Sequence, residues 1–224
     1  MPANEHLTMQ IASQVYGIET AENVLIFFKD GEIAYLTKRY DYNEKGEKLA
    51  KEDFASLSRK TAQTHGEHYK YQGNYLQLFD IMKKYLPAYR VEAIKLFRLL
   101  IFNYLFSNGD AHLKNFSLLE TPLGDFRLSP AYDLLNTRLH IDDDDFALED
   151  QLLPRTQHKG GLRNHFHLLA EAAGISNTQE KRSFDKFLSQ SAKVEILINA
   201  SFLSEKSKRS YLQHYQRRLR KLIG

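Results

Sequence analysis

The feature that most constrains the fold is a strongly apolar segment, residues 91–106, that leads directly into a dense polar loop. Its apolar residues recur every three to four positions, which predicts a helix, and additional apolar positions predict burial on most of its sides. The segment ends at the turn-forming sequence Ser-Asn-Gly at 107–109. Four polar residues follow within six positions: Asp110, His112, Lys114 and Asn115. A buried helix that delivers so many polar side chains to one loop indicates a functional site there.

The overall composition is that of a folded globular protein. The chain has 224 residues, 42% of them hydrophobic and 26% charged, so neither disorder nor a fibrous fold is indicated. There is no cysteine, which excludes disulfides, thiolate metal sites and a cysteine nucleophile. The first ten residues lack the pattern of a signal peptide, and no apolar run is long enough to span a bilayer. We therefore expect a cytoplasmic protein without membrane contact.

The remaining elements follow from periodicity and turn signals. A helix over residues 5–16 and a β-hairpin of 23–28 and 32–40 around Asp30-Gly31 are expected first, followed by a polar loop over 41–51. A second hairpin is expected from 116–119 and 126–128. The run Asp142–Asp145 is expected to form an exposed loop, because like charges repel. Further helices are predicted over residues 52–64, 75–85, 162–173, 179–202 and 205–222.

Three oxygen-bearing side chains in and after the polar loop suggest phosphoryl transfer. Asp110 is followed five positions later by Asn115, then by a hairpin and by Asp133, which is the spacing of a kinase catalytic loop and its metal-binding aspartate. In that arrangement the first Asp accepts the proton of a substrate hydroxyl, while the Asn and the second Asp ligate Mg²⁺. Lys114 could place a positive charge near the transferred phosphoryl group.

More ordinary interpretations exist for each of these residues. An isolated Asp and Asn at this spacing is common by chance, and both residues are frequent in turns, but the hairpin and Asp133 favour the catalytic interpretation. His112 is expected to be structural, because no second histidine stands near it at ligand spacing. The basic residues of the last predicted helix are expected to face solvent, with at most a weak contact to DNA.

The sequence of this region resembles one family closely. Asn108-Gly-Asp-Ala-His-Leu-Lys-Asn-Phe-Ser-Leu, followed by Leu128-Ser-Pro-Ala-Tyr-Asp133, is similar to the catalytic core of HipA-like serine/threonine kinases, the toxin kinases of bacterial toxin–antitoxin modules. The resemblance implies that Asp110 is the catalytic base, that Asn115 and Asp133 bind Mg²⁺, and that Lys114 and His112 assist. It also implies ATP as the phosphoryl donor, a protein serine or threonine as the acceptor, and a helix-turn-helix antitoxin as a possible partner.

The resemblance extends over most of the chain and divides it in two. Residues 1–42 resemble part of a kinase N-lobe and hinge, in which Lys38, Arg39 and Tyr40 would contact the nucleotide, and residues 43–224 resemble a helical C-lobe. The expected fold is thus α+β and protein-kinase-like, with an N-lobe reduced to one helix and a hairpin. The family's glycine-rich loop and phosphate-binding lysine precede the segment that resembles Asn4–Gly17, and this sequence contains neither.

Several explanations of this missing part stay open. The sequence could be truncated, a companion polypeptide could supply the missing N-lobe, or the protein could be a catalytically inactive kinase-like interaction module. A kinase of small molecules, similar to aminoglycoside or lipid kinases, is a further alternative, because those enzymes share the same Asp and Asn logic.

Overall fold

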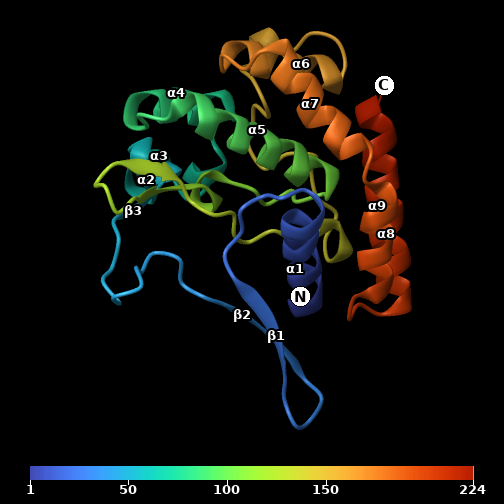
Figure 1. Cartoon of the computed structure of the whole chain (residues 1–224). Helices are drawn as coiled ribbons and strands as arrows, with labels where there is room; N and C mark the ends of the chain where they lie inside the picture. Colours follow the sequence, from blue (N-terminus) through green and yellow to red (C-terminus); the bar gives the residue numbers. More distant parts are fainter. Residues whose placement is uncertain (224) are drawn as a thin grey trace.

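The longest element of the first half, helix α5, forms the centre of the molecule, and the other elements are arranged around it (Figure 1). The structure is a computed structural model that describes residues 1–223. The helices are α1 (Pro2–Gln10, continued by a π-helical turn Ile11–Val15), α2 (Phe54–Leu57), α3 (Ala62–His65), α4 (Leu76–Tyr85), α5 (Tyr89–Leu105), α6 (Leu162–Ala172), α7 (Asn177–Leu188), α8 (Ser191–Ala200) and α9 (Glu205–Ile223). The strands are β1 (Asn23–Phe27), β2 (Ile33–Thr37), β3 (Lys51–Asp53), β4 (Ser117–Glu120) and β5 (Phe126–Leu128).

Helix α5 is buried because apolar side chains occupy almost its entire circumference, as the sequence predicts. Residues 99–105 of the helix are all buried, and contacts with α4, α7, α9 and β5 surround it. A single cluster of buried apolar side chains extends through the molecule from Leu7 in α1 to Leu222 in α9. The loop that follows α5 therefore starts from the buried core of the protein.

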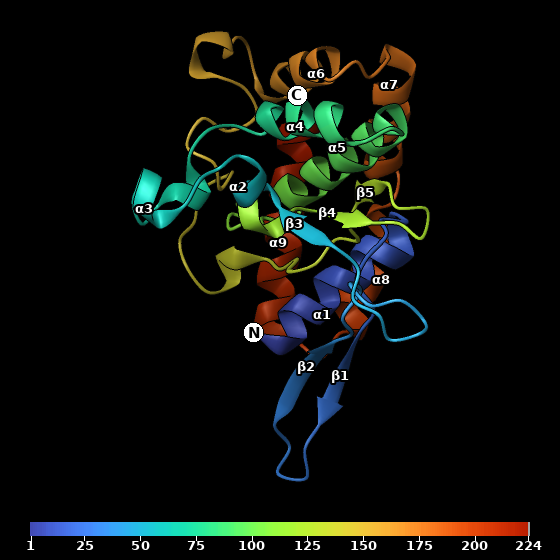
Figure 2. The ribbon, with the colours of Figure 1, turned by 90° about the vertical axis from the view of Figure 1, so that its left-hand side faces the viewer.

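The two sheets differ in their surroundings. The hairpin of β1 and β2 pairs in the register Val24↔Leu36, and its turn end projects beyond α1 (Figures 1 and 2). The predicted turn at Asp30-Gly31 is confirmed, but β2 ends at Thr37 and not at Tyr40. Tyr40 leaves the hairpin and stacks on Tyr132, with ring centroids 5.6 Å apart.

The second sheet corrects one of the predicted helices. The expected hairpin of β4 and β5 is present, but β3 pairs with the other edge of β4, which gives a three-stranded sheet in the order β3-β4-β5. The single helix predicted over residues 52–64 is wrong, since this segment begins within β3 and then forms the short helices α2 and α3. Asp53 ends the strand and caps α2 by accepting a hydrogen bond from the amide of Ser56 at 2.9 Å, and Arg59 adopts a positive φ just after that helix.

The last third of the chain is helical, as expected, with one break. The helix predicted over residues 179–202 is divided at Ser189 and Gln190 into α7 and α8. The apolar residues of the two halves face different neighbours, because α7 packs against α5 while α8 packs against the π-helical turn Ile11–Val15. Within residues 1–223, no helix is long and apolar enough to cross a membrane.

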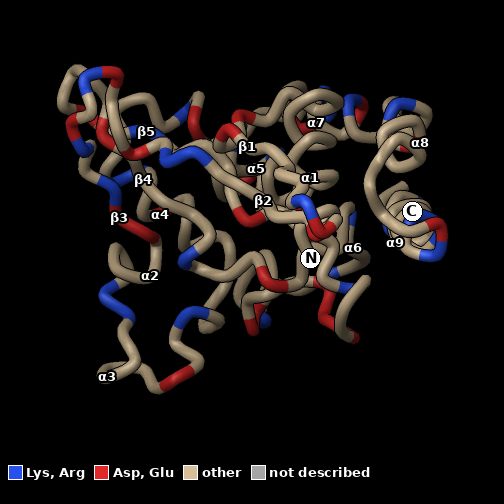
Figure 3. Tube along the Cα trace, turned by 90° about the horizontal axis from the view of Figure 1, so that it is seen from below, with Lys and Arg blue, Asp and Glu red and all other residues tan. Residues whose placement is uncertain are grey.

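Basic and acidic residues are interspersed along the chain near the second sheet. In Figure 3 the Lys and Arg residues alternate with Asp and Glu along the loops around β3, β4 and β5. The loop Asp142–Asp145 is only partly exposed, because Asp143 and Asp145 are half-buried. The expectation of a fully solvated acidic loop is therefore wrong for these two residues.

Candidate active site

The loop after α5 begins with a residue in a left-handed conformation. Ser107 has φ +55°, which turns the chain sharply out of the helix. Asn108 then closes this turn: its backbone amide donates to the carbonyl of Asn103 at 2.9 Å, and its side-chain nitrogen donates to the carbonyl of Asp133 at 3.3 Å. The end of α5 is thus joined directly to the second predicted metal ligand.

Asp110 lies at the edge of a pocket and is held by a tyrosine. The hydroxyl of Tyr71 donates a hydrogen bond of 2.8 Å to Asp110 Oδ1. Burial, followed by this hydrogen bond and the nearby carboxylate, raises the pKa of Tyr71 to about 12, so it remains a donor at neutral pH. The ring of His112 meets the Tyr71 ring edge-on, with centroids 5.1 Å apart. Tyr71 was not a candidate site residue, because a lone tyrosine in a polar loop carries no distinguishing sequence signal.

His112 contributes to the loop through its backbone. Its amide donates to Asn115 Oδ1 at 3.0 Å, while the ring is buried and Nδ1 has no hydrogen-bond partner among the described residues. Burial lowers the pKa of His112, against the opposing influence of Asp110, and this favours a neutral ring at physiological pH.

Asn115 and Asp133 lie in direct contact. Asn115 Nδ2 donates to Asp133 Oδ2 at 2.5 Å, and the position of Asp133 is fixed by a left-handed backbone with φ +58°. Burial and the charge of Asp110 raise the pKa of Asp133, with Asn115 acting in the opposite direction. Two carboxylates in one partly buried place are an environment that a divalent cation would relieve.

The donors fit Mg²⁺ in their chemistry. Asp133 offers carboxylate oxygens, and Asn115 Oδ1 has a second lone pair free, since the His112 amide uses only one. Residues 1–223 contain no cluster of three or more His, Cys, Asp or Glu side chains that could hold a metal ion. Mg²⁺ usually takes few protein ligands and completes its shell with water and phosphates, so a site with two protein ligands suits it.

Two pockets have Asp133 as a common lining residue. The first, which we call the Asp110 pocket, has a volume of about 700 Å³ and is lined by Tyr71, Gly109, Asp110, Asp133 and residues of the segment 135–149. The second, which we call the hinge pocket, has a volume of about 470 Å³ and is lined by Glu5, Thr37–Asp41, Lys51, Tyr132 and Asp133.

The residues predicted to contact a nucleotide all line the hinge pocket. Lys38 forms an exposed ion pair of 3.0 Å with Glu22, whereas the Arg39 guanidinium pairs with Asp41 and holds the pKa of that carboxyl below its ordinary value. Tyr40 forms an aromatic wall with its stacked partner Tyr132.

Lys51 and Glu5 also line this pocket and were not predicted. The Lys51 ammonium lies 5.3 Å from the centre of the Tyr40 ring and 5.5 Å from that of Tyr132. Burial, together with the charge of Asp133, raises the pKa of Glu5 to about 7. Lys51 is remote from Asp133 in sequence, and only the pairing of β3 with β4 brings it to the site.

Lys114 is not brought together with the other candidates. Its side chain is exposed, lines neither of these two pockets and forms no ion pair with another described residue. Its carbonyl accepts a hydrogen bond of 2.7 Å from the Tyr132 hydroxyl, so its backbone supports the pocket wall. A role for the ammonium group in catalysis stays a prediction.

Comparison with known proteins identifies the family. The family described as the HipA-like C-terminal domain matches residues 1–195. The chain belongs to this family. Among curated relatives of this HipA-like chain, a Haemophilus influenzae protein named "Putative kinase" is 23% identical over 96% of the chain and 68% of its own length. A Sinorhizobium fredii protein named "Putative kinase Y4dM" is 31% identical over 66% of the chain and 37% of its own length.

Solved structures place the HipA-like chain in the kinase fold. HipA from Shewanella oneidensis, solved with HipB and operator DNA, superposes with a TM-score of 0.68 at 20% identity, over 98% of this chain and 54% of HipA. The Helicobacter pylori proinflammatory kinase CtkA superposes with a TM-score of 0.66 at 15% identity, over all of this chain and 85% of CtkA. The predicted α+β, HipA-like fold is thereby confirmed. The chain spans about half the length of the HipA that it resembles.

Proposed function

We propose that this HipA-like chain transfers the γ-phosphoryl group of ATP to a serine or threonine of a protein, with Mg²⁺ as cofactor. The observation that carries the proposal is that Asp133 lines both pockets. The hinge pocket would take the nucleotide, and the Asp110 pocket would take the acceptor. In phosphoryl transfer the nucleotide phosphates and the acceptor hydroxyl come together beside the metal ion. Asp133, a proposed Mg²⁺ ligand, is the residue that the two pockets share.

The residues have distinct roles in this proposal. Asp110 accepts the proton of the attacking hydroxyl, and Tyr71 fixes the orientation of its carboxylate. Asp133 and Asn115 hold Mg²⁺, which would neutralise phosphate charge when bound. Lys38, Arg39 and Tyr40 contact the nucleotide, and Lys114 and His112 assist at the catalytic loop.

A companion polypeptide that completes the nucleotide site forms part of the proposal. The face of the projecting hairpin that carries Val24, Ile26 and Leu36 is apolar, and these side chains are 50%, 39% and 53% exposed. An uncovered apolar sheet face is typical of an interaction surface. HipA is solved with HipB and DNA, and a DNA-binding antitoxin is accordingly the second proposed partner, in a toxin–antitoxin role.

The test is phosphoryl transfer from γ-³²P-labelled ATP with Mg²⁺, measured with the full chain alone and with the products of neighbouring genes. Asp110→Asn should lower the rate about 10²- to 10⁴-fold while the protein stays folded, since a general base contributes that much. Asp80→Asn, in the exposed part of α4, is the control and should leave the rate unchanged.

The location of the label separates the alternatives. Label on protein serine or threonine supports the proposal, and label on a small molecule supports a small-molecule kinase. Nucleotide binding without any transfer, in every combination of partners, would identify an inactive interaction module.

A further inference from the structure

A buried arginine near the end of the chain reaches the beginning of the catalytic loop. Arg218 lies on α9, beyond residues 1–195 that match the family, and its side chain is 1% exposed. A charged group is buried at high cost unless it is paired. The guanidinium of Arg218 forms an ion pair with Asp145 and lies 4.6 Å from the centre of the Tyr104 ring on α5.

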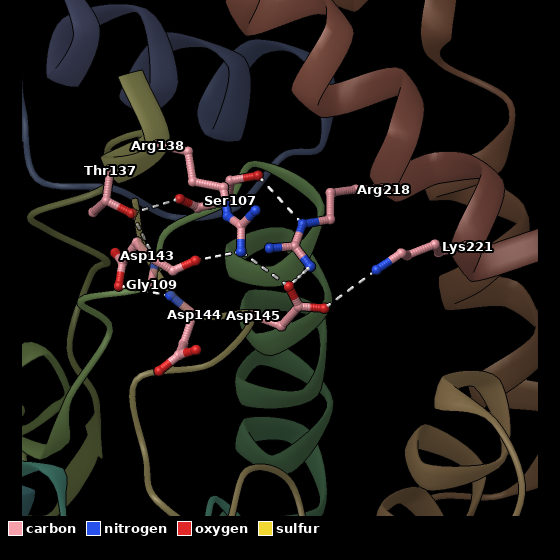
Figure 4. Close-up of polar contacts among 9 residues, drawn as sticks. All are labelled: Ser107, Gly109, Thr137, Arg138, Asp143, Asp144, Asp145, Arg218 and Lys221. Carbon is pink, nitrogen blue, oxygen red and sulfur yellow. Dashed lines mark hydrogen bonds and ion pairs between the residues drawn. The ribbon is translucent and has the colours of Figure 1, made fainter. Parts of the chain in front are cut away.

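A first chain of hydrogen bonds leads from Arg218 to the backbone of the catalytic loop. Its Nε donates to the hydroxyl of Ser107 at 3.4 Å, at the left-handed residue where the chain leaves α5 (Figure 4). The carbonyl of Ser107 accepts hydrogen bonds from the amide and the hydroxyl of Thr137, at 3.1 and 2.9 Å. The hydroxyl oxygen of Thr137 accepts in turn from the amide of Gly109 at 3.1 Å, directly before Asp110.

A second chain of contacts passes through the acidic segment Asp142–Asp145. Asp145 also pairs with Arg138 at 3.2 Å and Lys221 at 3.7 Å, so three cations surround one carboxylate. Burial raises the pKa of Asp145, but these cations outweigh burial and the pKa is lowered. Arg138 also donates to the carbonyl of Asp143, whose carboxyl group lies directly against Gly109.

Both chains of contacts end at Gly109, directly before Asp110. Figure 4 shows Thr137, Gly109 and Asp143 close together, with Arg138 and Arg218 converging on Asp145. The acidic segment Asp142–Asp145 is thus joined to α9 by the ion pairs of Asp145. Asp143 and Asp144 of this segment line the Asp110 pocket together with Gly109 and Thr137.

We propose that Arg218 is a positioning residue, which fixes the orientation of Asp110 through its hydrogen bond to Ser107 and through its ion pair with Asp145 in the acidic segment. The consequence for catalysis depends on the proposed kinase function, whereas the consequence for the geometry of the loop does not. An intact α9 would then be needed for phosphoryl transfer as well as for folding.

The test compares five variants of the full chain. Arg218→Met and Asp145→Asn each remove one end of the pair, and the double variant removes both. Arg220→Met changes an exposed arginine of the same helix and is the matched control. Arg218→Lys keeps the charge and guards against a simple failure of Arg218→Met to fold.

Two readouts are needed. The first is the amide signals of Gly109 and Asp110 in ¹H–¹⁵N NMR spectra, which report on the loop without any activity. The second is kcat for phosphoryl transfer to a mixture of serine- and threonine-containing peptides, with KM for ATP measured in parallel. We expect shifted amide signals and a kcat about 10²-fold lower in Arg218→Met, because a small misplacement of a catalytic group costs about that much.

The pattern across variants decides the outcome. KM for ATP should change less than twofold, Arg218→Lys should recover at least a tenth of the lost kcat, and the double variant should lose no more than the worse single variant. Unchanged Gly109 and Asp110 signals in folded Arg218→Met protein would overturn the positioning role. If the signals shift but the wild type transfers no phosphate with any partner, the kinase proposal fails and the positioning role stands.

Discussion

At the scale of single residues, the candidate site brings three carboxyl groups close together, those of Asp110, Asp133 and Glu5. Asp133 is close to both Asp110 and Glu5, and burial makes the charged forms of Asp133 and Glu5 more costly. The titration of Glu5 falls in the physiological pH range, because its pKa is raised to about 7. Glu5 therefore makes its own contribution to the pH dependence of the stability, and a comparison with a Glu5 variant isolates that contribution.

Replacing Glu5 by Gln should remove that contribution. Between pH 4.5 and 7 the folded protein retains a proton on Glu5 that the unfolded chain has lost, so the contribution of Glu5 to the stability should fall as the pH rises and level off above 7. Because the group is partly solvent-exposed, the full shift is discounted, and Glu5→Gln should be more stable than wild type by about 1 kcal/mol at pH 8. Urea unfolding at pH 4.5, 6 and 8 measures this, and parallel pH profiles of the two proteins would contradict it.

Gly109 is required for a different reason, namely the space taken by its neighbour. A Cβ at this position would overlap the carboxyl group of Asp143. Gly109→Ala should therefore lower the free energy of unfolding by about 1–3 kcal/mol, because a side chain must be displaced from a packed site. In the double variant Gly109→Ala/Asp143→Ala, at least half of that loss should be recovered.

Differential scanning calorimetry compares these variants with a matched control. Gly161→Ala adds a Cβ that meets nothing within 4 Å, and should cost only about 0.5 kcal/mol from a poorer helix N-cap. No recovery in the Asp143 double variant would show that the overlap is not the cause.

At the scale of elements, sequence patterns correctly predicted those helices and turns that depend on local signals. The amphipathic helices, the Asp-Gly turn and the position of the polar loop after α5 all followed from periodicity and turn chemistry. Strand β3 did not, since three charged residues, Lys51–Asp53, become a strand only because β4 offers a free edge from more than sixty positions away.

The same limit applies to the candidate site. Asp110, Asn115 and Asp133 could be found because they lie close together in one motif. Tyr71, Lys51 and Arg218 were missed because contacts between remote segments, and not a pattern, bring them to the site. A basic residue on an amphipathic helix normally faces water, and the burial of Arg218 depends on Asp145.

One face of the projecting hairpin packs on the rest of the protein, and the opposite face is open. Leu25 points to the side that packs on α1, and it is 9% exposed, whereas Val24 and Leu36 lie on the opposite, open face. Leu25→Ala should lower the free energy of unfolding by about 2 kcal/mol. Val24→Thr and Leu36→Thr should each change it by less than about 0.5 kcal/mol.

Urea unfolding of the isolated chain tests this difference, and a large loss in Val24→Thr would mean that the open face is covered in solution. Association of the chain with itself, detected by sedimentation, would be the first explanation to examine in that case.

At the scale of the whole molecule, the first and last helices are joined in one core. The hydroxyl of Tyr211 on α9 donates to the hydroxyl oxygen of Thr8 on α1 at 2.8 Å, and Thr8 donates to the carbonyl of Asn4 at 2.9 Å. Both side chains are fully buried. The segment predicted as a separate N-lobe thus shares its packing with the end of the predicted C-lobe.

Cooperative unfolding of the whole chain is the expected consequence. Tyr211→Phe leaves an acceptor of Thr8 unpaired, which should cost about 1 kcal/mol. Because α1 and α9 belong to one core, hydrogen exchange should report the same loss for amides in α1 and in α6. The exposed Tyr85→Phe, on α4, is the control and should change neither. A loss confined to α1 would instead mean that residues 1–42 unfold as a separate domain, as the sequence-based division proposes.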